Sequence, residues 1–278
     1  MDSIDLNYGF LKNIERKKMF NNRWKKKRPD EASSEGTITF LLTDNDYETR
    51  SLDIKTGSEL IPQWFKDIPA KVKLRSNDTK EDLSIKRCIP VLDAITTGYY
   101  LVTTKDYTFE YDKELEVSKI SGYDVSQRNI TMHPATQLGG MPFSPEYIKY
   151  AYKWGNDYTI KTPPGYSILF THPLNYPYLP FYTLSGVVDT DTYIMPVLFP
   201  FIMKNNFEGT IPAGTPVIQI IPFKRDDWKS DIINQPHDLF RGMKEAARQE
   251  YESGRYDKEG NPLGGMYKRD YRKKKKYL

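Results

Sequence analysis

TPPGYSILFTHPLNYPYLPFYTLSGVVDTDTYIMPVLFPFIMKNNFEGTIPAGTPVIQIIPF, residues 162–223, is the stretch of the chain that decides its fold. Short apolar runs alternate in it with Pro, Gly and Asp residues, which favour turns. The tight turn Pro163-Pro164-Gly165 leads into one strand, and Gly186-Val187-Val188-Asp189 ends another strand in a carboxylate. The turn at 211–216 leads into a last strand. This pattern predicts short β-strands joined by tight turns.

The rest of the chain repeats this pattern. Runs with strand character, rich in β-branched and aromatic residues, occur at 37–42, 99–102, 107–111, 167–170 and 217–221. Runs of this length and spacing are typical of antiparallel sheets. Two prolines bracket Trp64 and Phe65, which predicts a short turn that pins Trp64 to the body. We therefore expect a mostly β domain, an antiparallel sandwich or jelly-roll, over residues 35–228.

The two ends differ from this domain in composition. Residues 1–34 are expected to form an N-terminal extension, and residues 229–278 a short helix followed by a tail. The helix is predicted over 238–251, because the composition favours helix and Asp238 is a suitable N-cap.

Composition narrows the class of protein. Apolar residues make up 38% of the chain, but aromatics reach 14%, with 21 Tyr, which favours a packed core over disorder. No apolar run is long enough to span a bilayer, so no membrane span is expected. The acidic start at Met1–Asp5 shows no secretory signal, and Cys88 is the single cysteine. We expect an intracellular protein in a reducing compartment, without a disulfide.

Charge is segregated along the chain. Residues 11–28 hold nine Lys/Arg against one Glu, and residues 268–278 hold seven Lys/Arg against one Asp, in a chain of net charge +4. We interpret these blocks as interaction arms on an acidic body. The side chains expected to contact a partner are Arg23, Lys25, Lys26, Lys27, Arg28, Lys273, Lys274, Lys275 and Lys276. Protein subunits, nucleic acid or an anionic membrane surface could attract these arms, charge alone does not choose between them, and simple solubility is the alternative.

Four elements resemble a family of unknown function from bacteria and tailed phages. They are the strand start at Pro163, the Gly-Val-Val-Asp-Thr-Asp element from Gly186, the last strand from Gly214, and Arg87-Cys88-Ile89-Pro90 followed by Gly98. The resemblance covers residues 60–228. It implies membership of that family and brings no known activity.

The order of elements is also similar to the dUTPase and dCTP deaminase superfamily, which has a trimeric jelly-roll-like β fold. This resemblance implies that Asp189 is the carboxylate that activates water and that Tyr193 is the ring that stacks on the base. It places a phosphate-binding loop near residues 171–175, where His172 and Asn175 are the candidate contacts beside Asp191. That loop lacks the Arg and Ser of the family pattern, and the Gly-rich C-terminal arm is missing.

Simpler structural roles compete with each of these assignments. Asp189 and Asp191 flank Thr190 in a pattern that is typical of a turn held by side chain to backbone hydrogen bonds. The Tyr and Phe residues between 176 and 182 are typical of a packed surface loop. His133, His172 and His237 are isolated in sequence, so no metal site and no cofactor are expected. Cys88 is expected to be a structural residue.

Three functions are compatible with the sequence. The leading hypothesis is a non-enzymatic structural or assembly protein, a homo-oligomer that forms part of a tailed-phage particle. The first alternative is a dUTPase-like nucleotide-binding enzyme or pseudoenzyme, with Asp189 as its catalytic residue. The second alternative is nucleic-acid binding through the basic arms.

Overall fold

The computed structural model describes residues 36–42, 50, 52–73, 81–121, 130–142, 144–147, 150–234, 237–253, 267–273 and 276–278. The predicted N-terminal extension lies outside these segments, and so do Arg23, Lys25, Lys26, Lys27, Arg28, Lys274 and Lys275. The described chain is mostly β, and its strands pair in antiparallel sheets. The predicted fold class is confirmed, and the specific jelly-roll order stays a prediction.

A five-stranded sheet forms one side of the fold. Its strands lie in the order β13 (Gly186–Val188), β11 (Tyr166–Thr171), β16 (Pro216–Lys224), β5 (Tyr99–Thr103) and β2 (Leu52–Thr56). The register sets Ile221 of β16 opposite Leu169, and Ile218 opposite Leu101. β16 lies in the middle and is buried from Pro216 to Ile220, which explains its nearly continuous apolar sequence.

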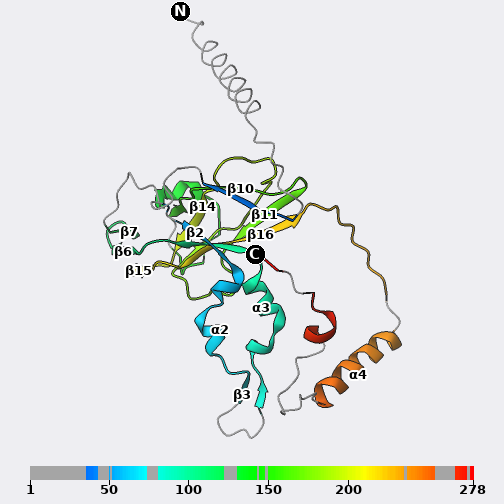
Figure 1. Cartoon of the computed structure of the whole chain (residues 1–278). Coiled ribbons are helices and arrows are strands. Elements are labelled where there is room, and N and C mark those ends of the chain that lie inside the picture. Colours follow the sequence, from blue (N-terminus) through cyan, green and yellow to red (C-terminus); the bar gives the residue numbers. More distant parts are fainter. Residues whose placement is uncertain are drawn as a thin grey trace, which may run out of the picture.

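A four-stranded sheet packs against it (Figure 1). Its order is β12 (Phe181–Thr183), β14 (Phe199–Met203), β9 (Ala151–Trp154) and β8 (Ile130–His133). The ring of Phe170 on β11 lies 5.2 Å from that of Phe199 on β14. Thr183 Oγ1 on β12 donates a 2.6 Å hydrogen bond to the carbonyl of Val217 on β16. The two sheets therefore share one core, in a sandwich-like arrangement.

Aromatic rings fill much of this core. Trp154 is fully buried and stacks on Phe201 at 4.4 Å between ring centroids, and Phe201 stacks on Tyr152 at 5.2 Å. The edge of Phe181 faces Trp154 at 5.3 Å. Such ring pairs add about 0.5–1.5 kcal/mol each beyond the burial of their area. The high aromatic content of the sequence is thus explained by the core.

Smaller elements complete the sandwich. The three-stranded sheet is β15 (Gly209–Ile211), β6 (Tyr107–Asp112) and β7 (Val117–Ile120), and β1 (Thr39–Leu42) pairs with β10 (Tyr158–Lys161). A 3-10 turn, η4 (Ala135–Leu138), follows β8. All five predicted strand runs are found, as β1, β5, β6, β11 and β16.

A lobe of short elements lies below the sandwich in Figure 1. We call the following elements the lobe: η1 (Gly57–Leu60), α2 (Gln63–Asp67), the β3 (Lys71–Lys73) and β4 (Glu81–Leu83) ribbon, η2 (Ile85–Arg87) and α3 (Ile89–Thr96). α2 packs Phe65 and Trp64 against the core, so Trp64 is pinned to the body as predicted, but by one short helix. The sequence analysis missed α3, although the proline in its first turn is a helix-start signal.

The chain after β16 leaves the sandwich (Figure 1). Residues 226–234 form an extended strap without helix or strand, and α4 (His237–Ser253) follows. We call residues 226–253 the C-terminal arm. The predicted C-terminal helix is confirmed, and a single π-helical turn, η5 (Tyr267–Tyr271), precedes the tail. Among the helices of the described segments, none has the length and apolar character needed to cross a bilayer.

Candidate functional site

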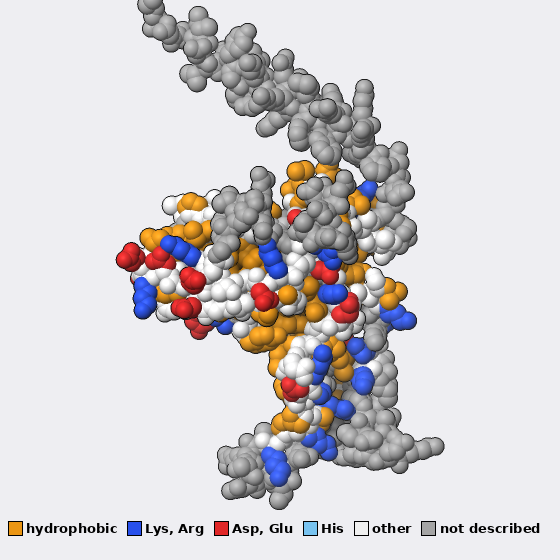
Figure 2. Space-filling view, turned by 60° about the vertical axis from the view of Figure 1, so that its left-hand side comes forward, with side chains coloured by type: hydrophobic (Ala, Val, Ile, Leu, Met, Phe, Trp, Pro, Cys, Tyr) orange, Lys and Arg blue, Asp and Glu red, His pale blue; other side chains and the backbone are white. Residues whose placement is uncertain are grey.

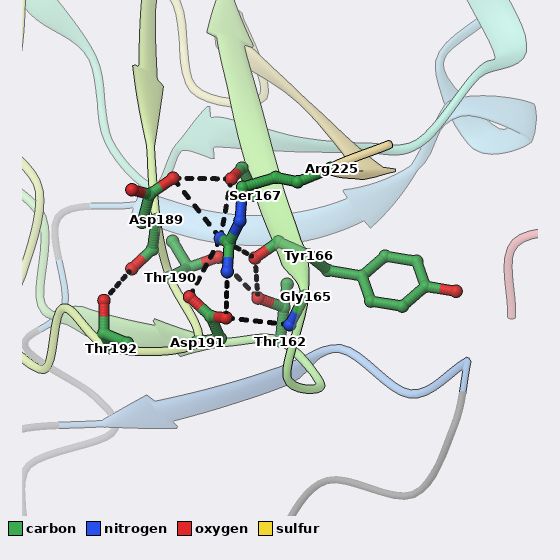
Figure 3. A network of polar contacts seen from close by, with 9 residues as sticks. All are labelled: Thr162, Gly165, Tyr166, Ser167, Asp189, Thr190, Asp191, Thr192 and Arg225. Carbon is green, nitrogen blue, oxygen red and sulfur yellow. Dashed lines mark hydrogen bonds and ion pairs between the residues drawn. The ribbon is translucent and has the colours of Figure 1, made fainter. Parts of the chain in front are cut away.

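Arg225 and Asp191 form the centre of a polar network at one end of the five-stranded sheet (Figure 3). Arg225 directly follows β16, and Asp191 lies in the turn after β13. Nη1 of Arg225 donates to Asp191 Oδ1 at 3.0 Å, and Nη2 donates to Oδ2 of the same carboxylate. The Gly165 N–H also donates to Oδ2, at 2.9 Å. Both carboxylate oxygens of Asp191 are therefore occupied within the chain.

Asp189 belongs to the same network but lies at its solvent side. Ser167 Oγ donates to Asp189 Oδ1 at 2.6 Å, and Arg225 Nη1 reaches the same oxygen at 3.3 Å. The side chain of Asp189 is 62% exposed, whereas that of Asp191 is 6% exposed. We call Ser167, Asp189, Asp191 and Arg225 the clamp.

Electrostatics follow from this geometry. The hydrogen bonds from Arg225 hold the pKa of the Asp191 carboxyl below its usual value, with a smaller contribution from the Gly165 N–H, while burial opposes this effect. The same pair raises the pKa of Arg225. Asp191 therefore stays ionised as the acceptor of a bidentate pair, the stronger kind of charge-assisted hydrogen bond.

A turn holds both aspartates in place. The carbonyl of Asp189 accepts hydrogen bonds from the N–H groups of Thr192 at 3.1 Å and Tyr193 at 2.9 Å. Thr190 between the aspartates is buried and shares a 2.7 Å hydrogen bond with Thr162. The structure thus contains the turn that the sequence offered as the simpler alternative. The side chain of Asp191 bonds to the turn at Gly165 and to Arg225, outside its own turn.

Tyr193 is 45% exposed, and its ring packs on no other ring among the described residues. The sequence analysis missed Arg225 and Ser167. Arg225 is the first residue after the last strand, and it lies 34 positions from Asp191. Only its place at the end of the central strand could have indicated a role.

His172 and Asn175 lie at the other end of β11. Asp189 contacts Ser167 near the start of the strand, and His172 follows its last residue. Five residues of extended chain span about 16 Å. Within one chain the structure therefore does not bring His172 or Asn175 to the clamp.

His172 is held as a neutral side chain. Its Nδ1 accepts a 3.3 Å hydrogen bond from the Thr183 N–H, and its ring stacks on Tyr182 at 4.8 Å. Nε2 lies 3.5 Å from the Tyr176 carbonyl, to which it can donate. Burial lowers the pKa of His172 to about 4, and the charge of Lys204 acts in the same direction. The neutral ring is thus held by backbone groups and packs within this loop, and its role as a phosphate contact stays a prediction.

Asn175 adopts a left-handed backbone conformation, with φ 64°, in the loop after His172. Gln219 on β16 fastens this loop, because its Oε1 accepts from the Leu174 N–H at 3.0 Å. Its Nε2 donates to the carbonyls of Ala94 at 2.9 Å and Thr97 at 2.7 Å. Gln219 is fully buried and joins the loop to α3, a role that the sequence analysis missed.

Compared with models of known protein families, the chain matches none. A search of curated proteins likewise gives no match.

The groups of the clamp differ in how far their oxygens are already bonded within the chain. Both carboxylate oxygens of Asp191 accept hydrogen bonds from Arg225 or Gly165. Of the two aspartates, only Asp189 therefore keeps a carboxylate oxygen turned toward solvent (Figure 3). Within the described segments, no three His, Cys, Asp or Glu side chains lie close enough together to hold a metal ion. What the clamp does directly is join the ends of β11, β13 and β16 at the point where the chain leaves the sandwich.

The C-terminal arm that begins beside the clamp exposes large apolar side chains. Trp228 is 90% exposed, and Ile232 is 94% exposed in the strap. On α4, Leu239, Phe240 and Met243 are also exposed. Their spacing places them on one side of the helix, as in an amphipathic helix that docks on a partner.

The predicted basic tail is in part tied to the body. Lys273 and Lys276 are exposed, as expected of an arm. Arg272, however, pairs with Asp93 on α3, with 3.0 Å between Nε and Oδ2. Tyr277 packs edge-on against Tyr99 at 5.7 Å, so this aromatic docks on its own chain.

Proposed function

We propose that this chain is a non-enzymatic structural protein that assembles with further copies of itself through the C-terminal arm. The observation that carries the proposal is the exposure of six apolar side chains in the described parts of the arm, namely Trp228, Ile232, Ile233, Leu239, Phe240 and Met243. Contiguous apolar surface of this kind marks an interaction site on a soluble chain. The arm leaves the sandwich and packs on neither sheet (Figure 1).

A second copy is the partner because the body carries a matching surface. β13 lies at the edge of the described five-stranded sheet, and Val187 on it is 60% exposed. In the loop after β13, Tyr193, Ile194, Met195 and Leu198 are exposed as well. An edge strand with apolar neighbours can accept an extended segment by β-strand addition, and the strap 226–234 has no strand partner of its own.

The area supports a stable contact. The apolar side chains of one arm expose roughly 700 Å², since an aromatic side chain alone buries about 150–250 Å². Reciprocal exchange between two copies buries about 1,400 Å² from the arms, before their acceptor surfaces are counted, and specific interfaces bury about 1,200–2,000 Å² in total. Charged and aromatic arms that order on contact suit subunits that lock together during assembly.

The clamp supports this function by setting the root of the arm. The Arg225 N–H donates to the Gly165 carbonyl at 2.8 Å, and its guanidinium donates to Asp191 in the turn after β13 and to the carbonyl of Tyr166, the first residue of β11. The arm therefore starts from a fixed position and direction, although its own residues are extended.

Sedimentation velocity over a range of concentrations tests the proposal. We expect the full chain to form oligomers that dissociate on dilution, and the Trp228→Ser/Ile232→Ser/Ile233→Ser variant to stay monomeric. The matched control, Leu115→Ser/Met132→Ser/Met141→Ser, removes exposed apolar residues elsewhere on the body and should assemble like the unchanged chain. A chain that is monomeric at about 100 µM, or an arm variant that assembles normally, would refute the proposal.

We further propose that the assembly is part of a tailed-phage particle, as the family resemblance implies. Mass spectrometry of particles purified from the source of this chain tests this. Several copies per particle are expected, and absence of the chain from purified particles would contradict it without affecting self-assembly.

A further inference from the structure

The lobe and the C-terminal tail form one surface, although they are far apart in sequence. Arg272 and Asp93 pair across 179 positions, and the Tyr99 hydroxyl donates to the Leu278 carbonyl at 3.2 Å. With the ring contact between Tyr99 and Tyr277, these contacts place the tail against α3 and β5. η5 lies beside α3 in Figure 1. Basic residues from both segments are thereby brought together.

This composite surface carries the positive charge of the molecule's body. The described parts of 61–96 and 267–278 hold ten Lys/Arg against five Asp/Glu, a formal +5, while the whole chain is only +4. The remaining residues are therefore net acidic. Figure 2 shows Lys and Arg side chains gathered over the region below the sandwich, whereas acidic side chains lie mostly on the sandwich.

The lysines of this surface point into solvent, and the described acids beside them already have partners. Lys66, Lys71, Lys73, Lys273 and Lys276 are exposed. Asp93 is taken by Arg272, and Asp67 accepts a 2.7 Å hydrogen bond from Gln63. On the ribbon, Lys73 is paired in register with Glu81, and Lys71 with Leu83. Among the described side chains, none of these five lysines forms an ion pair with an acid, although Glu81 lies opposite Lys73 in the ribbon.

We propose that this lobe and tail surface binds the phosphate backbone of a nucleic-acid duplex without reading its base sequence. Lys71 and Lys73 lie on the same face of β3, about 6.6 Å apart along the strand. That separation is close to two intervals of the 3.4 Å charge spacing on one strand of a duplex. A lysine side chain binds a phosphate as a single charge and lacks the two-pronged geometry by which arginine recognises planar groups. Phosphate contacts of this kind add affinity without a preference for base sequence.

On the lobe side of this surface, the exposed apolar residues favour a duplex over a membrane or single strands. The exposed apolar side chains of the lobe are aliphatic, namely Val72, Leu83 and Ile85. Phe65 is buried and Trp64 is half-buried, so the described lobe offers no exposed Trp or Phe, whereas on the tail side Tyr267 and Tyr271 of η5 are 49% and 64% exposed. Helices that lie on membranes and platforms for single strands both use exposed aromatic rings.

Salt-dependent binding to a fluorescein-labelled 30-base-pair DNA of random sequence tests the proposal. With the full chain, log K should fall linearly with log of the salt concentration between 50 and 200 mM. The slope of log K against log salt becomes shallower by about 0.9 for each phosphate contact that is lost. Lys66→Ser/Lys71→Ser/Lys73→Ser should therefore reduce the slope by about 2–3, and Lys273→Ser/Lys276→Ser by about 1–2.

The control removes the same charge from other sites. Lys113→Ser/Lys153→Ser/Lys229→Ser has the same change in net charge as the lobe variant and should keep the slope within about 0.5 of the unchanged chain. Two outcomes would overturn the proposal. One is equal slopes for the lobe and control variants, with binding lost instead in Lys25→Ser/Lys26→Ser/Lys27→Ser. The other is binding to phosphatidylserine vesicles without binding to the duplex.

Discussion

One guanidinium determines how the last strand of this protein ends. Arg225 binds Asp189, whose side chain is exposed, and Asp191, whose side chain is buried. This difference in exposure gives the two aspartates different roles in stability. Asp191 is enclosed by Arg225 and the Gly165 N–H, whereas Asp189 shares one oxygen between Ser167 and Arg225 and turns the other to solvent. The stability of the clamp therefore depends on Asp191 more than on Asp189.

Asp191→Asn should lower the free energy of unfolding by on the order of 1–2 kcal/mol, because an amide nitrogen would face the donors of Arg225 or Gly165. Asp189→Asn should change it by less than about 0.5 kcal/mol, as is usual for exposed side chains. Urea unfolding of both variants measures this. Equal losses for the two substitutions would show that the clamp does not distinguish them.

The imidazole of His172 makes stability depend on pH. The unfolded chain takes up a proton near pH 6.5, whereas the folded chain does so only near pH 4, so stability should decrease as the pH falls from about 6.5 to 4. The difference corresponds to on the order of 3 kcal/mol. The groups around the ring are Lys204, Tyr176 and Tyr182.

Unfolding measured at pH 7, 5.5 and 4.5 tests this, with His172→Gln as the reference. The glutamine can accept from Thr183 and donate to Tyr176 without titrating, so it should lose less stability over this interval than the unchanged chain. Parallel pH curves for the two proteins would show that His172 is not the source.

At this scale the sequence indicated some members of the clamp and not the others. The pair Asp189 and Asp191 could be selected because a carboxylate at a strand end is conspicuous. Their partner Arg225 could not, since pairing across 34 residues depends on strand order. For the same reason His172 and Asn175 could be suggested as neighbours of Asp189, although one strand length separates them.

At the scale of elements, the close approach of β5 and β16 depends on one glycine. Gly98 has φ +74°, and a Cβ there would lie 2.0 Å from the carbonyl oxygen of Ile220 on β16. The neighbouring strand cannot move away, because it is bonded on its other side to β11. The conformation and the contact both require glycine.

Gly98→Ala should therefore destabilise the fold by more than about 3 kcal/mol, combining backbone strain with overpacking. Gly214→Ala is the matched control, since Gly214 has φ +83° but open space around a Cβ. Gly214→Ala should lower the free energy of unfolding by about 1–2 kcal/mol, which is the cost of the left-handed backbone conformation alone. A thermal melt of both variants compares them, and similar losses would show that the contact with Ile220 is not limiting.

Strands were predicted more reliably than helices. β5, β6, β11 and β16 each contain a compact run of β-branched and aromatic residues, which is a local signal. α3 was not predicted, because it is only eight residues long and begins within the Arg87-Cys88-Ile89-Pro90 motif. Short helices held by tertiary contacts carry little sequence signal of their own.

For the whole molecule, Trp228 reports whether the arm is free or docked. It is 90% exposed in the single chain, whereas Trp154 is fully buried and Trp64 is half-buried. Fluorescence emission should therefore shift to shorter wavelength as concentration rises and Trp228 becomes covered. Trp228→Phe should abolish the shift, and a shift that persists in this variant would assign it to another tryptophan.

The molecular organisation was predicted only in part. The mostly β body and the helix after it follow from composition and periodicity, which are local properties. The lobe surface could not be foreseen, because the tail reaches it through Arg272 and Tyr277, and such a contact is set by the fold and not by spacing in the sequence.

The position of β16 also constrains the order of events during synthesis. β5 and β11 are hydrogen-bonded to β16 and not to each other, so the middle of the five-stranded sheet is missing until residues 216–224 have left the ribosome. Until then, a nascent chain carries two open strand edges and many unburied aromatic rings. Such chains are prone to aggregate and depend on chaperones. A stop codon anywhere before β16 should therefore yield an insoluble product, whereas one placed after Arg225 should leave a folded body that lacks only its arm and tail.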